Sequence, residues 1–355
     1  MSATQVNRKH IVLGTLTLGL VVVAGLYIVK WNPYFYKAIS AASSHSIGES
    51  IVSGTQAAPP EPSLGAALSY AGDYFVAVWK ALVLGLLIGS GVQALLPREW
   101  LTKALGRVGF GSTTIAAALA IPSMMCTCCA APVAVGLRKC RASAGAAAAY
   151  LVGNPMLNPA TVVFMGFVLG WEWSALRVAV ALLLVFGVAY LADHMVPREV
   201  DVTRTPEVTG VEGLEAPEEG NPFVRWAKIL GKMSLLLLPE YAVVVLALGA
   251  ARAFIFPHID PAVGNGLLLA VWLAIGGTLF MIPTAAEIPI VQGLMSAGLG
   301  PLGAGVLLTT LPAISLPSLL MAKRGLPTGV LLMVGGSVAL VGLLSGLVAL
   351  TLSFS

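Results

Sequence analysis

A long apolar stretch with a break in its middle decides how this chain folds. Residues 108–141 read VGFGSTTIAAALAIPSMMCTCCAAPVAVGLRKCR. Two prolines, Pro122 and Pro132, interrupt the stretch where one spanning helix would have to continue. A single crossing would also place the basic residues at its end on the outer side, against the positive-inside rule. We therefore predict a re-entrant hairpin of two half-helices, which enters and leaves on the cytoplasmic side.

The composition indicates a membrane protein. Of the 355 residues, 57% are hydrophobic and only 10% are charged, and the mean hydropathy is +0.90. Soluble domains carry about 25% charged residues. So few charges exclude a soluble enzyme, a disordered chain and a nucleic-acid-binding protein. Four cysteines make no disulfide framework. No nucleotide-binding glycine-rich loop is present, which argues against ATP-driven transport by this chain, and we expect no cofactor.

Further spanning helices, each of about 20 apolar residues, are expected along the chain. The candidate spans are residues 11–29, 74–96, 143–170 (interrupted at 153–155), 174–191, 228–252, 300–321 and 327–352. A second broken stretch covers residues 264–298, with its break between Pro283 and Pro289. The sequence therefore predicts an all-α membrane protein, a polytopic helical bundle.

The two halves of the chain resemble one another at an offset of 157 residues. The aligned pairs include Pro132 with Pro289, Gly136-Leu137 with Gly293-Leu294, Pro155 with Pro312, Asn158 with Ser315, and Met124 with Met281. The order of elements also agrees: a span, a broken hairpin, a broken span and a span. Because the predicted topology orients the two units oppositely, we expect inverted repeats, each with a re-entrant hairpin, after one extra N-terminal span.

Four parts follow from this pattern. Residues 1–72 form an N-terminal anchor span and an external loop, 73–192 the first repeat, 193–227 a flexible cytoplasmic linker, and 228–355 the second repeat. The polar linker carries many acidic residues and no apolar period. We expect a multi-pass protein of the plasma (inner) membrane, with the N-terminus cytoplasmic and the C-terminus external, because this topology places most Lys and Arg inside.

Three of the four cysteines gather at the tip of the first hairpin. Cys126, Cys128 and Cys129 follow Met125, and thiolates and thioethers are soft ligands for Cu(I) and other thiophilic species. The start of the returning half-helix would present free N–H groups to them. Alternatively, these residues pack a tight hairpin as small apolar side chains. Cys140, between two basic residues, is interpreted as a loop thiol without a transport role.

Other polar residues lie at helix breaks or inside spans. Asn154, Asn158 and Ser315 stand beside prolines, where they could line a path or cap helix ends. Glu287 lies at the second hairpin tip and Glu240 in mid-span. Acids inside spans are costly and often belong to proton relays, so both are proton-coupling candidates. The alternatives are a hydrogen bond to hairpin N–H groups for Glu287 and a position near a helix end for Glu240.

The segment Cys126-Thr127-Cys128-Cys129-Ala130-Ala131-Pro132 resembles the Cys-Ser-Cys-x-x-x-Pro signature of the ArsP-type predicted permeases. The resemblance covers roughly residues 74–352, and Gly153-Asn154-Pro155-Met156-Leu157-Asn158 also follows the family pattern. It implies export of trivalent organoarsenicals with Cys126 and Cys128 as ligands of the metalloid or soft-metal cargo. Cys129 stands where Ser is common in the family, and the second repeat has no cysteine.

We therefore expect a secondary permease, not an enzyme, that exports a thiophilic solute by proton antiport. Its expected partners are the cargo and the lipid bilayer, with a possible homo-oligomer and no nucleic acid. One alternative is a permease for a soft metal ion or a sulfur-containing species. Another is a membrane thiol oxidoreductase that uses Cys126 and Cys129. An aquaporin-like channel is disfavoured because Asn158-Pro159-Ala160 meets Ser315-Leu316-Pro317 in the repeat, so the paired motif is missing.

Overall fold

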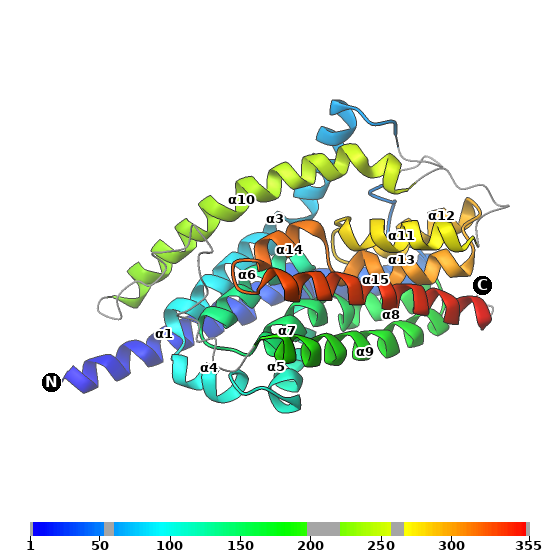
Figure 1. The fold of residues 1–355 in the computed structure, drawn as a ribbon. Coiled ribbons are helices and arrows are strands. Elements are labelled where there is room, and N and C mark those ends of the chain that lie inside the picture. Colours follow the sequence, from blue (N-terminus) through cyan, green and yellow to red (C-terminus); the bar gives the residue numbers. More distant parts are fainter. Residues whose placement is uncertain (1–2, 53–59, 197–220, 257–265, 353–355) are drawn as a thin grey trace.

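The protein is a bundle of helices (Figure 1). The computed structural model describes residues 3–52, 60–196, 221–256 and 266–352. The helices are α1 Ala3–Leu26, the π-helical turn η1 Tyr27–Trp31, α2 Asn32–Ser44, α3 Leu64–Leu95, α4 Arg98–Leu105, α5 Phe110–Ser123, α6 Thr127–Lys139, α7 Ala144–Met156, α8 Pro159–Val168, α9 Trp171–Met195, α10 Pro222–Ile255, α11 Leu267–Leu279, α12 Glu287–Ser296, α13 Pro301–Ala313, α14 Leu316–Ala322 and α15 Thr328–Thr351.

Seven helical segments of the described chain are long and apolar enough to cross a membrane. They are Val12–Ser44, Leu64–Leu95, Ala144–Val168, Trp171–Met195, Pro222–Ile255, Pro301–Ala322 and Thr328–Thr351. The prediction of an all-α, multi-pass membrane protein is confirmed. Several of these helices expose large apolar side chains on their outer surface, as lipid contact requires.

The first broken stretch forms the predicted hairpin. Helices α5 and α6 are joined by three non-helical residues at 124–126, and Met124 has a left-handed backbone with φ 48°. At the open end of the hairpin, the Ser143 amide donates to the Leu105 carbonyl at 2.7 Å. The chain therefore enters and leaves this hairpin at the same place. Helix α4 meets α5 at a bend of 112°.

The prediction of an external loop over residues 31–72 is wrong for most of that segment. The N-terminal helix continues through η1 and α2 to Ser44, and α3 begins at Leu64. Helix α2 is stabilised by packing on α8, where Ala41 is fully buried, and its mixed composition hides this contact in the sequence. Helix α3 begins early because the Ser63 hydroxyl accepts a hydrogen bond from the Ala66 amide at 3.0 Å.

Other boundaries also differ from the prediction. The break in the 143–170 span lies at Leu157–Asn158 and not at 153–155, because Pro155 is accommodated inside α7. The second hairpin breaks over residues 280–286, before Glu287. The predicted linker 193–227 is shorter than expected, because its first residues belong to the end of α9 and its last residues to the start of α10. Residues 197–220 lie outside the described part of the chain.

The helix boundaries repeat at the offset found in the sequence. Helices α5, α7, α8 and α9 begin at residues 110, 144, 159 and 171, and α11, α13, α14 and α15 begin at 267, 301, 316 and 328, each 157 later. The corresponding helices α3 and α10 also run antiparallel. The start of α10 lies on the end of α3, where Trp226 donates to the Ser90 hydroxyl at 3.0 Å, and Gly249 near its end lies against Tyr70. Inverted repeats require corresponding helices to run in opposite directions. That the two repeats as a whole are inverted stays a prediction.

The basic segments collect at one end of the bundle. The start of α1 packs on the end of α3 through Gly14 and Leu95, and Arg138 at the end of α6 donates to the Gly325 carbonyl at 3.2 Å. Helix α4 lies at this end, whereas α12 and the end of α15 lie at the other (Figure 1). The described termini are thus at opposite ends of the bundle, and the assignment of the basic end to the cytoplasm stays a prediction.

Cysteine accessibility in intact cells tests this topology. We expect a membrane-impermeant maleimide to label Ser296→Cys from outside and Lys139→Cys only after the membrane is opened, because the two sites end the two oppositely directed hairpins. The four natural cysteines are all buried, so the unmodified protein serves as the unlabelled control. Labelling of both variants from the same side would contradict the inverted arrangement.

Candidate functional site

Breaks in four helical segments converge on one small cavity inside the bundle. The first hairpin tip contributes Cys126 and Thr127, and the second contributes Thr284 and Glu287. The other lining residues, from the second tip and from the α7–α8 and α13–α14 segments, are Pro155, Thr161, Ile282, Pro283, Ala285, Leu311 and Pro312. The cavity holds about 10 Å³, enough for about one water molecule. Broken helices that meet in this way form the cargo sites of many secondary transporters.

The cysteines lie at the start of α6. Cys126 is the residue before the first turn, and its sulfur is 3.0 Å from the sulfur of Cys129. The Cys128 sulfur is 3.5 Å from the Ser315 hydroxyl and 3.8 Å from the Tyr74 hydroxyl. All three cysteines are buried and free. Within the described residues, no group of three or more His, Cys, Asp or Glu is placed to hold a metal ion.

Aromatic rings from three segments lie next to the thiols. Tyr74 on α3 contacts Cys128, and its ring is 6.0 Å from Tyr70 and 6.1 Å from Tyr241 on α10. Tyr70 packs on Phe280 of the second hairpin tip, and its hydroxyl donates to the Met281 carbonyl. The cysteines therefore adjoin an apolar, aromatic wall. Tyr70 and Tyr74 look like ordinary residues of a span in the sequence, and nothing there marks them as part of a site.

The N-terminal segment also reaches the site, which the sequence analysis missed. Lys30 in η1 is only 4% exposed, and its ammonium donates to the Tyr34 and Thr284 hydroxyls at 3.1 Å each. The neighbouring Trp31 indole donates to the Pro122 carbonyl of the first hairpin at 2.7 Å. Lys30 and Trp31 thus hold both hairpin tips. The signal available in the sequence was a lysine directly after the apolar run of residues 11–29.

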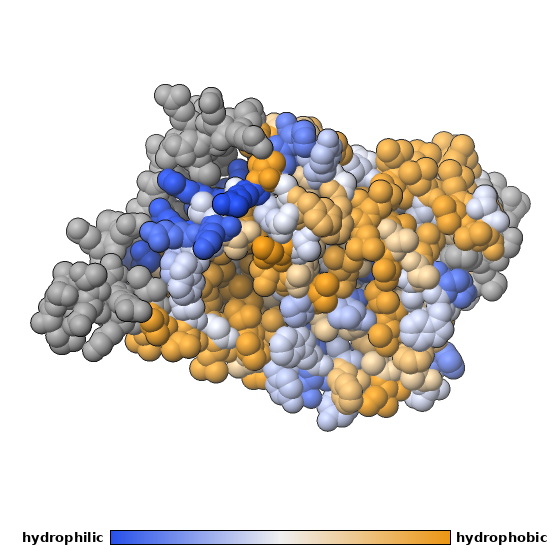
Figure 2. All heavy atoms as spheres, turned by 90° about the horizontal axis from the view of Figure 1, so that it is seen from below, coloured by the Kyte–Doolittle hydropathy of each residue, from blue (hydrophilic) through white to orange (hydrophobic). Residues whose placement is uncertain are grey.

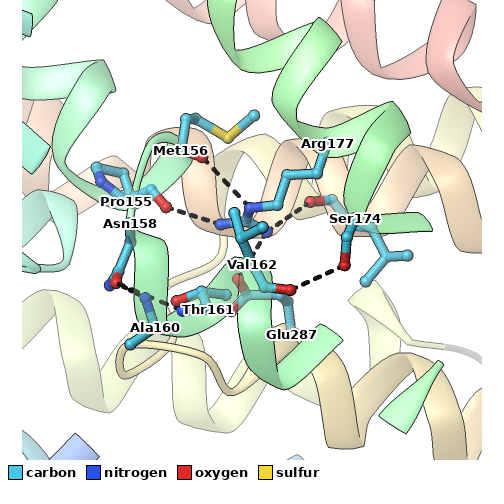
Figure 3. A network of polar contacts seen from close by, with 10 residues as sticks. Pro155, Met156, Asn158, Ala160, Thr161, Val162, Ser174, Arg177 and Glu287 are labelled. Atoms are coloured by element: carbon cyan, nitrogen blue, oxygen red, sulfur yellow. Dashed lines mark hydrogen bonds and ion pairs between the residues drawn. The ribbon is translucent and has the colours of Figure 1, made fainter. Parts of the chain in front are cut away.

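A buried ion pair crosses between the two halves of the chain (Figure 3). The Arg177 guanidinium on α9 is 2.9 Å from a Glu287 carboxylate oxygen on α12, and both side chains are at most 2% exposed. Arg177 also donates to the Pro155 carbonyl at 2.7 Å and to the Met156 carbonyl at 3.4 Å. Arg177 was not among the predicted site residues, although a lone arginine inside a span is itself a functional signal.

Several polar atoms beside the cavity have no hydrogen-bond partner in the described structure. They are the second carboxylate oxygen Oε2 of Glu287, the Thr161 hydroxyl and the Asn158 amide nitrogen. Figure 3 shows these residues around the Arg177–Glu287 pair. Buried polar atoms are usually satisfied, so unpaired ones next to a cavity indicate a place for water or a polar group of the cargo.

The remaining predicted residues divide between the site and the scaffold. Asn158 caps α8 by accepting from the Ala160 amide at 3.0 Å, and Ser315 caps α14 while touching Cys128. Asn154 accepts from the Met125 amide at 3.4 Å and so holds the first hairpin tip. Glu240 does not line the cavity. It is one-third exposed and pairs with Arg324 at 2.9 Å.

Comparison with known proteins places this architecture in a family. The family model ArsP_1, described as a predicted permease, matches residues 12–128 and 63–350. The UPF0718 protein YraQ of Escherichia coli is 49% identical over 332 residues, which is 93% of each chain. The UPF0718 protein MJ0584 of Methanocaldococcus jannaschii is 21% identical over 305 residues, covering 69% of this chain and 84% of that protein. No solved structure matches the chain.

The buried ion pair can be tested by its contribution to stability. We expect Arg177→Met to lower the free energy of unfolding by about 3–5 kcal/mol, because it leaves the Glu287 carboxylate buried without a partner. Thermal unfolding of the purified protein in detergent would measure this, and adding Glu287→Gln should recover part of the loss. Glu240→Gln is the matched control: its pair is partly exposed, so a cost below about 1 kcal/mol is expected. Equal losses in the two single variants would contradict the cross-linking role.

Proposed function

Because this chain belongs to the ArsP-type family of predicted permeases, we propose that it is a secondary permease that exports a thiophilic solute, most simply a trivalent organoarsenical, by proton antiport. The observation that carries this proposal is the pair of Cys126 and Cys129 sulfurs, 3.0 Å apart where the broken helices converge. Two sulfurs this close can bind one soft atom together.

The surroundings of the thiols suit an organic metalloid. Sulfur ligands prefer soft cargo, and the aromatic wall of Tyr70, Tyr74 and Tyr241 offers apolar contact to an attached organic group. The free N–H groups at the start of α6 favour negative charge on nearby sulfur. In this proposal all three cysteines are cargo ligands: Cys126 and Cys129 form the close pair and Cys128 is the third thiol. Ser315 and Met125 border the site.

The proposed energy coupling uses the Arg177–Glu287 pair. A proton on Glu287 removes one charge of the pair and so weakens the link between α9 and α12. Protonation would thereby bias the arrangement of the two halves, which is the requirement for coupling a proton to alternating access. The free Oε2 atom of Glu287 beside the cavity gives the proton a place to arrive. Glu240 is the second candidate carrier.

Two other functions remain alternatives. A soft metal ion or a sulfur-containing species would use the same thiols, with Met125 as an added soft ligand. A thiol oxidoreductase would use Cys126 and Cys129, whose close sulfurs also suit disulfide formation. Titration of free thiols with and without a trivalent arsenical separates them: a carrier protects its thiols reversibly, whereas an oxidoreductase loses two thiols on oxidation and regains them on reduction.

Replacement of the cysteines tests the ligand assignment. We expect Cys126→Ser and Cys128→Ser to abolish resistance of cells to the arsenical while protein stays in the membrane, because a hydroxyl has little affinity for As(III). Cys140→Ser is the matched control. Cys140 lies at the opposite end of α6 from the cluster and does not line the cavity, so it should be dispensable. Normal transport by a double variant at 126 and 128 would show that the cluster is structural.

Replacement of Glu287 tests proton coupling. Glu287→Gln keeps the shape and a hydrogen-bonding oxygen but cannot release a proton. We expect proteoliposomes with this variant to retain cargo exchange and to lose flux driven by a pH gradient, by about tenfold or more. Combining it with Arg177→Gln removes the uncompensated cation and controls for instability. Full retention of the driven flux would remove Glu287 from the mechanism, and equal loss of both fluxes would assign it a structural role.

A further inference from the structure

A basic hollow at the α4 end of the molecule lies outside the cysteine site. It encloses about 630 Å³ and is lined by Arg98, Glu99, Thr102, Lys103, Gly106, Arg107 and Arg141. Four of these side chains are basic and one is acidic. In the parts of the chain that the structure describes, the side chains of Lys103, Arg107 and Arg141 make no ion pair and no hydrogen bond. Lys103, Arg107 and Arg141 thus bring three positive charges to the hollow, against the one negative charge of Glu99.

The hollow is built by a close contact between two chain turns. Gly106, which ends α4, lies so close to the Arg141 backbone that an added Cβ would be 3.0 Å from its carbonyl oxygen. Arg141 itself has a left-handed backbone with φ 67°, which non-glycine residues rarely adopt. The Ser143 amide fixes the same junction by its bond to Leu105. The turn at Arg141 thus brings the Arg141 guanidinium into the same hollow as the basic side chains of α4 and of the turn after α4.

Apolar side chains border this charge. Trp100 on α4 is 60% exposed and Phe110 at the start of α5 is 73% exposed. Figure 2 shows a hydrophilic patch at this end of the molecule beside apolar surface. The 112° bend turns α4 away from the direction of α5. A short helix turned aside at the end of a bundle, with tryptophan next to basic residues, is typical of the membrane–water interface.

We propose that this hollow binds the phosphodiester headgroup of an anionic phospholipid. Guanidinium groups bind phosphate oxygens in bidentate geometry, and three of the four cations here are arginines. The exposed rings of Trp100 on α4 and Phe110 at the start of α5 offer apolar contact to the glycerol and acyl chains of such a lipid. Basic hollows between membrane helices on the positive side select acidic lipids in this way. The apolar border favours a lipid over a free phosphate ion, because the ion has no apolar part to contact it.

Native mass spectrometry of the full-length protein in detergent tests this proposal. Phosphatidylglycerol and phosphatidylcholine are added at equal concentrations, and the bound lipids are counted. We expect saturable binding that prefers phosphatidylglycerol, and at least a tenfold weaker affinity in Arg107→Gln/Arg141→Gln. Lys103→Gln, on exposed α4, should weaken binding in the same direction and keeps the test valid if the double variant folds poorly.

The matched control also removes two positive charges, but from residues elsewhere at the basic end. Lys228→Gln/Lys323→Gln changes two exposed lysines outside the hollow, and we expect wild-type lipid binding from it. Equal weakening in both double variants would overturn the proposal in favour of diffuse attraction. Complete displacement of the lipid by an equal concentration of inorganic phosphate, or equal binding of phosphatidylcholine, would overturn it as well. None of these outcomes depends on the transported cargo.

Discussion

The ion pair between Arg177 and Glu287 is the contact on which the centre of this bundle depends. A charge inside an apolar bundle is costly unless it is paired and hydrogen-bonded. Arg177 meets both conditions, and Glu287 is paired through one of its two carboxylate oxygens. Arg177 also binds the Pro155 and Met156 carbonyls, where α7 ends and no helical N–H is available. One arginine therefore compensates a buried acid and satisfies the backbone of a broken helix. It also ties the first half of the chain to the second.

The N-terminal segment adds a second tie between the same elements. Lys30 holds the second hairpin tip through Thr284, and Trp31 holds the first through Pro122. Both residues lie in a π-helical turn, a distortion that is frequent at functional sites. The extra helix is therefore more than an anchor, because any movement that separates the hairpin tips must break one of its two hydrogen bonds. Its contacts give this segment a direct influence on access to the cysteines.

Local patterns made much of this architecture predictable. The prolines, the cysteine cluster and the basic residues after it lie within one stretch, so the first hairpin could be inferred from residues 108–141 alone. The repeat was detectable because prolines and glycines of the first half recur in the second at a single offset of 157 residues. The pairing of Arg177 with Glu287 could not be inferred, because 110 residues separate them and only the packing of α9 near α12 joins them. Lys30 and α2 were missed for the same reason: their partners lie far away in the chain.

The charge balance beside the cysteines bears on which cargo fits. Lys30 and Arg177 are buried cations next to the cavity, and Glu287 is the buried anion there. Apart from any thiolate among the cysteines, these three side chains leave one positive charge in excess. In a medium of low dielectric constant this excess repels a further cation and favours a neutral or negative solute. A trivalent organoarsenical with hydroxyl ligands is soft and neutral, whereas a soft metal ion enters with its charge and needs thiolates to offset it. For the proposed permease, this charge balance is therefore an argument for a neutral metalloid rather than a metal ion.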